Sequence, residues 1–123
     1  RLPANLRLYG AFDSYGNLPL AASDGWLYTS GWDGIPTILI ELAAHGLPIV
    51  ASAVGGVPEL IDETTGWPLA AEATAADYAA AITAMLADPE ERRKRGAALQ
   101  DRVRRQHSRA FYAAALADAA KGS

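Results

Sequence analysis

Apolar residues form short runs along the first half of the chain, and glycine or proline stands beside most of them. These runs predict strands at residues 6–11, 26–30 and 48–52. The second and third runs are continuously apolar, which is typical of strands that are covered on both faces. Residues 36–44 read PTILIELAA, with proline in the first turn and Gly46 just past the end, so they predict a helix. A short helix fits residues 18–22.

The second half of the chain is rich in alanine and has helical spacing. Thr74 is followed three residues later by Asp77, which predicts a capping box and a helix to about residue 87. The side chains of Tyr78, Ile82 and Met85 recur at spacings of four and three, so we expect them on the buried side of this helix.

Two further helices are expected after this one. Asp88 followed by Pro89 predicts a capped helix start, with Glu91 reaching back to the cap, and Ser108 predicts a last helix to about residue 120. The order strand, helix, strand, helix, strand predicts an α/β fold with parallel strands and right-handed crossovers. Only three or four strands are visible, whereas a complete dinucleotide-type domain has about six. We therefore expect half of a doubly wound, Rossmann-like parallel sheet with a helical C-terminal tail.

The composition fits one ordinary globular domain. The chain has 123 residues, of which 50% are apolar and 20% are charged, so it can close a core and disorder is not expected as its main state. We expect a single domain over residues 1–123, with an α/β part at residues 1–70 and a helical part at residues 71–123. No apolar run reaches the roughly 18 residues of a membrane helix, which predicts no transmembrane segment.

The N-terminus and the cysteine count bear on where the chain acts. It begins with Arg1 rather than Met and lacks the apolar core of a signal peptide, so we expect a piece of a longer, cytoplasmic protein. The absence of cysteine is compatible with this location, and it excludes disulfides, thiol nucleophiles and cysteine-based zinc sites.

Positive charge is concentrated in one segment. Residues 90–109 carry eight arginines or lysines against three acidic side chains, whereas residues 1–89 carry two arginines against ten acidic side chains. Such a segment could bind nucleic acid or an anionic membrane surface. No aromatic residues stand between the arginines, which favours the solvated face of a helix instead. We therefore expect no ligand, and no nucleic acid, at Arg92, Arg93, Lys94 and Arg95.

Ligands of open α/β sheets bind beyond the carboxyl ends of the strands, which here are followed by residues 31–36 and 53–58. Neither segment has the GxGxxG or Walker A pattern. The first one offers the carboxylate of Asp33 and then a helix start, whose free N–H groups suit an anion. Those groups would belong to Gly34, Ile35, Thr37 and Ile38, since Pro36 has no N–H. The alternative is that these amides bind only water.

Glu41 is the only charged residue between Asp33 and Glu59, and its neighbours in the predicted helix are apolar. A helix that is apolar on nearly every side is covered by protein. A buried carboxylate would lose several kcal/mol of hydration without a partner. Two interpretations of Glu41 are therefore open: a thin exposed stripe of the helix, or contact with a polar ligand.

These motifs together resemble a known family. Residues 33–36 read DGIP, residues 41–52 read ELAAHGLPIVAS and residues 54–59 read VGGVPE. They are similar to the nucleotide-sugar half of retaining GT-B glycosyltransferases, above all group 1, also called glycosyltransferase family 4. The hallmark of that family is a glutamate, seven residues and a second glutamate, a spacing that Asp33 and Glu41 hold. The resemblance extends from about Leu8, where LRLYGAF resembles a strand and loop of the family, to about Arg105.

The resemblance implies roles for individual residues. Glu41 matches the glutamate that hydrogen-bonds the ribose hydroxyls of the nucleotide, and Asp33 matches the catalytic-site carboxylate that contacts the transferred sugar. The segment Gly34, Ile35, Pro36, Thr37 and Ile38 matches the loop and helix start that meet sugar and diphosphate. Phe12 resembles a residue that contacts the base. The Gly55-Gly56 loop either shares in this site or only turns the chain. No metal and no cofactor is implied, with the nucleoside-diphosphate sugar as donor substrate.

Two departures from the family pattern matter. The first glutamate is shortened to Asp33, and the family's basic residues for the diphosphate lie before Arg1. The N-terminal acceptor-binding domain would also precede this chain, so we expect the isolated fragment to be inactive. Peripheral membrane association of the longer protein stays open.

The expected function is sugar transfer with retention. A nucleotide-sugar epimerase of the same architecture and a non-catalytic binding module are the alternatives.

Overall fold

The computed structural model describes residues 3–8, 10, 18–29 and 37–122, with side chains up to residue 106. In these residues three strands form one parallel sheet in the order β1, β2, β3. The strands are β1 (Trp26–Tyr28), β2 (Ile49–Ser52) and β3 (Trp67–Leu69). Leu27 pairs with Val50, and Ala51 pairs with Pro68. The predicted α/β class and the parallel direction of the strands are confirmed.

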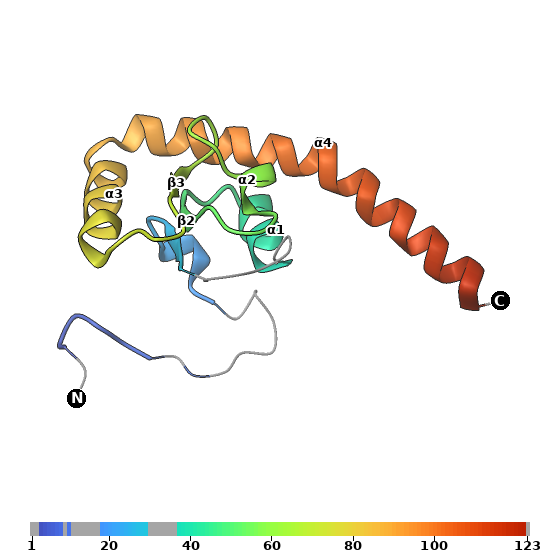
Figure 1. Cartoon of the computed structure of the whole chain (residues 1–123), viewed down its shortest axis with the longest axis horizontal. Helices are drawn as coiled ribbons and strands as arrows, with labels where there is room; N and C mark the ends of the chain where they lie inside the picture. The colour runs from blue at the N-terminus through green and yellow to red at the C-terminus, as the bar shows by residue number, and fades with distance from the viewer. Residues whose placement is uncertain (1–2, 9, 11–17, 30–36, 123) are drawn as a thin grey trace.

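Helices cover both faces of this sheet (Figure 1). A 3-10 turn, η2 (Leu20–Ala22), precedes β1, and α1 (Thr37–Ala44) connects β1 to β2. The short α2 (Val57–Leu60) follows β2, and α3 (Ala75–Ala87) follows β3. Figure 1 shows α1 and α3 on either side of the strands, while α4 (Pro89–Gly122) runs along the top of the molecule and extends beyond it.

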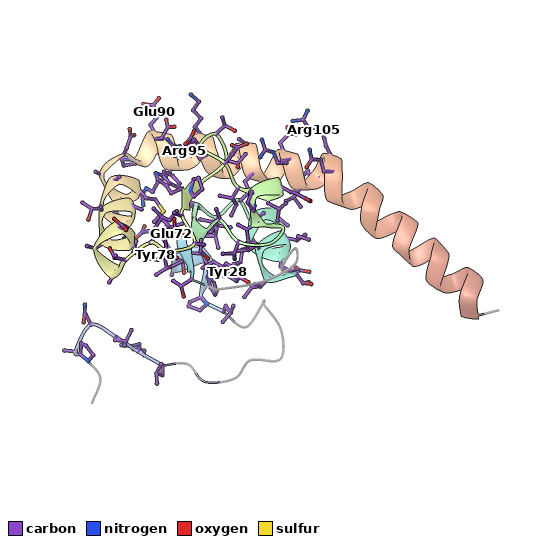
Figure 2. All side chains as sticks on the ribbon, viewed as in Figure 1. Tyr28, Glu72, Tyr78, Glu90, Arg95 and Arg105 are labelled. Atoms are coloured by element: carbon purple, nitrogen blue, oxygen red, sulfur yellow. The ribbon has the colours of Figure 1, made fainter. Side chains whose placement is uncertain are left out.

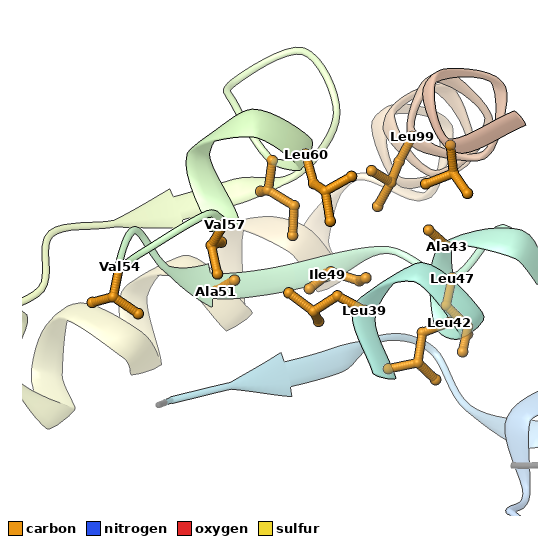
Figure 3. Close-up of a cluster of buried hydrophobic side chains, with 12 residues drawn as sticks. Leu39, Leu42, Ala43, Leu47, Ile49, Ala51, Val54, Val57, Leu60 and Leu99 are labelled. Carbon is orange, nitrogen blue, oxygen red and sulfur yellow. The ribbon is translucent and has the colours of Figure 1, made fainter. Parts of the chain in front are cut away.

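The core lies between β2 and the helices α1, α2 and α4 (Figure 3). All four residues of β2 are buried, as expected for a strand covered on both faces. The side chains around it are aliphatic and almost fully buried: Leu39, Leu42, Ala43, Leu47, Ile49, Ala51, Val54, Val57, Leu60, Ile61, Leu99 and Val103. Because Leu99 and Val103 belong to α4, this helix is part of the core and not an appendage.

The predicted helix boundaries in the middle of the chain are confirmed. Thr74 and Asp77 form a capping box, with a Thr74 N–H to Asp77 Oδ2 distance of 2.8 Å. These bonds lower the pKa of Asp77. Met85 is buried, while Tyr78 and Ile82 are half-buried. Asp88 Oδ1 accepts from the Glu91 N–H at 3.0 Å, as a cap should.

The prediction of a first strand at residues 6–11 is wrong for its described residues, 6–8 and 10, which form no strand. Leu6 donates its N–H to the Pro3 carbonyl, and the side chains of Leu6 and Leu8 are 51% and 75% exposed, so no burial drives this run onto the sheet. The third strand is β3, which sequence reasoning missed because Pro68 interrupts the pattern. A proline is tolerated in this edge strand because an edge strand has one side free of ladder hydrogen bonds.

The prediction of a separate last helix from Ser108 is also wrong, because α4 is continuous from Pro89 to Gly122. Residues 97–121 contain neither glycine nor proline and are rich in alanine and other helix formers. A serine hydroxyl can cap a helix only where the backbone before it leaves the helical conformation, and nothing in this segment causes that.

The basic segment of α4 is only partly a solvated face. Arg95 donates to the Gly66 carbonyl at 2.8 Å and to Glu91 Oε1 at 2.9 Å, and its guanidinium lies 4.6 Å from the ring centre of Trp67. Arg92 pairs with Asp24 at 3.5 Å. Arg93 and Lys94 are exposed, as expected. In Figure 2 the Arg95 side chain points from α4 toward the sheet, whereas Glu90 and Arg105 lie on the outer face.

Among the residues that the structure describes, no helix combines the length and the apolar character needed to cross a membrane.

Candidate functional site

The carboxyl ends of the three parallel strands lie at one edge of the sheet, where ligands of such folds bind. Strand β1 is followed by residues 30–36, which lie outside the described residues, and then by the first turn of α1 at Thr37. Strand β2 is followed by the Gly55-Gly56 turn and strand β3 by Ala70. The first turn of α1 therefore belongs to this edge.

Glu41 lies on an exposed stripe of α1. Thr37, Glu41 and Ala44 are exposed and recur at spacings of four and three, which places them on one face of the helix. Leu39 and Leu42 on the opposite face are fully buried. Glu41 is therefore exposed and not covered by protein, which leaves its contact with a polar ligand as a prediction. Among the described residues no group pairs with its carboxylate, so both oxygens are available to a ligand.

The structure describes three of the predicted site residues. Thr37 and Glu41 lie one turn apart on the exposed stripe, and Ile38 is half-buried and packs against the core. The others fall outside the described residues: Phe12, Asp33, Gly34, Ile35 and Pro36. The set of site residues therefore stays a prediction, and its described members all belong to α1.

The Gly55-Gly56 loop turns the chain between β2 and α2. Gly55 has a φ of 53°, a conformation that costs other residues but not glycine. Gly56 stands at the N-cap position of α2, and its carbonyl accepts from the Glu59 N–H at 3.1 Å. The turn itself accounts for the glycine at position 55.

Comparison with known proteins identifies the family. Residues 2–102 match the model of the family described as glycosyl transferases group 1. The chain belongs to this family. Over 64 residues this glycosyltransferase chain is 44% identical to the amylovoran biosynthesis glycosyltransferase AmsK of Erwinia amylovora, a match that covers 51% of the chain and 14% of AmsK.

The fold of this glycosyltransferase chain is similar to that of a sucrose-phosphate synthase from Thermosynechococcus elongatus, with a TM-score of 0.65 and 30% identity. The match covers 77% of the chain and 27% of the synthase. The chain is therefore a GT-B glycosyltransferase domain with a helical C-terminal part, and it spans about a quarter or less of the length of these two relatives.

Two residues of α4 that contact the end of α1 were missed by sequence reasoning. Gly96 packs directly on the Gly46 carbonyl oxygen, at the end of α1, where a Cβ would collide with it. Gln100 donates from Nε2 to the Ala44 carbonyl at 2.9 Å. The sequence offers one signal for this contact, which is the glycine itself. A glycine inside a helix lowers the stability of the helix, so its presence indicates a close approach of another backbone.

Proposed function

We propose that this chain is the nucleotide-sugar-binding part of a retaining glycosyltransferase, which transfers a sugar from a nucleoside-diphosphate sugar to an acceptor. The observation that carries the proposal is Glu41, an exposed carboxylate without a protein partner among the described residues, on a helix that starts at the carboxyl edge of the sheet. Its spacing of seven intervening residues from Asp33 is that of the two carboxylates in this family. Membership in the group 1 family supports the same reading.

Each proposed contact uses a group suited to it. Glu41 accepts hydrogen bonds from the two ribose hydroxyls, which a carboxylate can do with both oxygens. The backbone N–H groups of Gly34, Ile35, Thr37 and Ile38 donate to diphosphate and sugar oxygens, aided by the dipole of α1. Asp33 contacts the sugar that is transferred, and Phe12 contacts the base.

The proposed chemistry is electrostatic. The sugar leaves the diphosphate, and the N–H groups at the start of α1 stabilise the negative charge that develops on the phosphate oxygens, with no metal or other cofactor required. Acceptor binding and the remaining cationic groups come from a further, N-terminal domain. A cytoplasmic location belongs to the same proposal.

Titration with nucleoside diphosphates tests this function. The 15N-labelled chain is titrated with uridine, adenosine and guanosine diphosphate, and the amide signals of Thr37, Ile38 and Glu41 are followed. We expect one of the three to shift these signals, and Glu41→Gln to weaken that binding about tenfold or more because a charge-assisted acceptor is lost. Glu63→Gln, a change at another exposed glutamate, is the control. Equal affinity of the Glu41→Gln variant and the parent would refute the proposal.

A further inference from the structure

The C-terminal end of α1 is closed by a Schellman motif. The Leu47 N–H donates to the Leu42 carbonyl at 3.4 Å, the Gly46 N–H donates to the Ala43 carbonyl at 2.9 Å, and Gly46 has a φ of 75°. This motif satisfies two of the carbonyls that a helix end leaves without an intrahelical donor. The carbonyl of Ala44 is left for another partner.

That partner comes from α4. Gln100 Nε2 donates to the Ala44 carbonyl at 2.9 Å, and its Oε1 lies 3.8 Å from where a Cβ on Gly46 would stand. Gly96, one turn earlier on α4, lies against the Gly46 carbonyl and permits this approach. Figure 3 shows Leu99 of α4 in the same buried cluster as Ala43 and Leu47.

This contact lies one turn from Glu41. Ala44 follows Glu41 by three residues and shares its exposed stripe, in a helix of only eight residues. A change in the tilt of the last turn therefore moves the Glu41 backbone, and the carboxylate moves with it. The buried contacts of Leu39 and Leu42 hold the opposite face of α1 but do not bond to its last carbonyl.

We propose that Gln100 is a positioning residue for Glu41: by bonding the Ala44 carbonyl, it fixes the end of α1 and the direction of the Glu41 carboxylate toward the nucleotide. This inference rests on the proposed function. A binding group must be held close to its productive position, so the hydrogen bond of Gln100 to the end of α1 affects the affinity for the ligand although Gln100 does not touch the ligand.

Three substitutions at Gln100 separate positioning from simple stability. Gln100→Ala removes the donor, Gln100→Glu replaces it with an acceptor of similar shape, and Gln100→Lys retains a donor whose positive charge suits a helix C-terminus. Gln106→Ala, at an exposed glutamine of the same helix, is the matched control. Glu41→Gln is measured alongside them.

The readouts are the dissociation constant of the nucleoside diphosphate that binds the parent chain and the amide shifts of Glu41 and Ala44, both recorded well below the unfolding midpoint. We expect binding about threefold weaker in Gln100→Ala, about tenfold weaker in Gln100→Glu and within about twofold of the parent in Gln100→Lys. The control should leave both readouts unchanged. A variant that fails to fold is set aside, because the other two still discriminate.

Three results would overturn the inference. If Glu41→Gln weakens binding while Gln100→Ala and Gln100→Glu do not, Gln100 has only a structural role and the proposed function stands. If Gln106→Ala weakens binding as much as Gln100→Ala, the effect is not specific to the α1 contact. If Glu41→Gln binds as the parent does, the proposed function fails, and the positioning role fails with it.

Discussion

Arg102 and Asp62 are forty residues apart in the sequence, and the Nη1 of the arginine lies 2.9 Å from the Oδ2 of the aspartate. The same nitrogen donates to the Leu60 carbonyl at 3.0 Å, so one guanidinium fastens α4 to the turn that precedes β3. Asp62 Oδ1 in turn accepts from the backbone N–H and the hydroxyl of Thr64, at 2.8 and 2.6 Å. The Asp62 carboxylate therefore connects Thr64 within the turn to Arg102 of α4.

Acid should weaken the fold through Asp62. The hydrogen bond from the Thr64 hydroxyl, followed by the bond from the Thr64 backbone and the contact with Arg102, lowers the pKa of Asp62 from 3.8 to about 2. The unfolded chain therefore takes up this proton first as the pH falls, so the stabilisation is complete above pH 3.8 and is lost toward about pH 2.

Urea unfolding at several pH values measures this effect. Because the Asp62 side chain is 48% exposed, we expect a loss of about 1 kcal/mol or less. Asp62→Asn should flatten this part of the pH profile, while the contribution of Asp77, whose pKa is lowered by its hydrogen bonds with Thr74, is the same in both proteins. Parallel profiles for the two proteins would contradict the prediction.

Arg95→Ala should destabilise the fold by about 1–3 kcal/mol, because it removes the bond to the Gly66 carbonyl and the contact with the Trp67 ring. Its neighbour Arg93 is exposed, so Arg93→Ala should stay within about 0.5 kcal/mol of the parent. Chemical denaturation of both variants gives the comparison. Similar losses in the two would mean that the contacts of Arg95 contribute little.

Gly96→Ala should also destabilise, although alanine is the better helix former. The added Cβ would collide with the backbone carbonyl of Gly46, which cannot rotate away as a side chain could. Overpacking of this kind costs about 1–3 kcal/mol, which exceeds the gain of about 1 kcal/mol in helix propensity. A thermal midpoint equal to or above that of the parent would show that α1 and α4 can move apart freely.

The Asp33→Asn variant should distinguish the role of Asp33 from that of Glu41 in the proposed site. We expect this variant to bind the free nucleoside diphosphate as the parent does and to bind the sugar donor more weakly, by about tenfold, because its proposed partner is the sugar. Calorimetric titration with both ligands, beside Glu41→Gln, provides the test. Weaker binding of the free nucleotide by Asp33→Asn would mean that the roles are assigned wrongly.

The 123-residue chain alone should transfer no sugar, and its nucleotide binding should not depend on a metal. Much of the rate of such a reaction comes from holding donor and acceptor together, and the proposed acceptor site lies in another domain. Incubation with labelled sugar donors checks the first point, and titration in the presence of EDTA checks the second. Labelled product, or binding abolished by the chelator, would contradict the respective expectation.

Elements whose determinants are local could be predicted from the sequence. The capping box of Thr74 and Asp77 and the glycine stop at Gly46 each depend on a few neighbouring residues, and both are confirmed. The exposed position of Glu41 was left open, because the sequence does not say which stripe of an apolar helix stays uncovered.

Elements that depend on distant partners could not be predicted. Leu6 and Leu8 have the pattern of a strand, but no described element covers them, whereas β3 forms in spite of Pro68 because β2 lies beside it. Arg95 and Arg102 look like surface charges in the sequence, and only the tertiary structure supplies Gly66 and Asp62 as their partners.

The place of α4 in the core has a consequence for synthesis on the ribosome. The strands, α1 and α2 emerge before α4, and their apolar face, which includes Leu39 and Leu60, stays open to water until Leu99 and Val103 have left the exit tunnel. The nascent chain therefore exposes an apolar surface during this interval. The core of this chain closes only when this part of α4 has left the exit tunnel, so a translational pause before that point would prolong the exposure of the apolar face and the risk of aggregation.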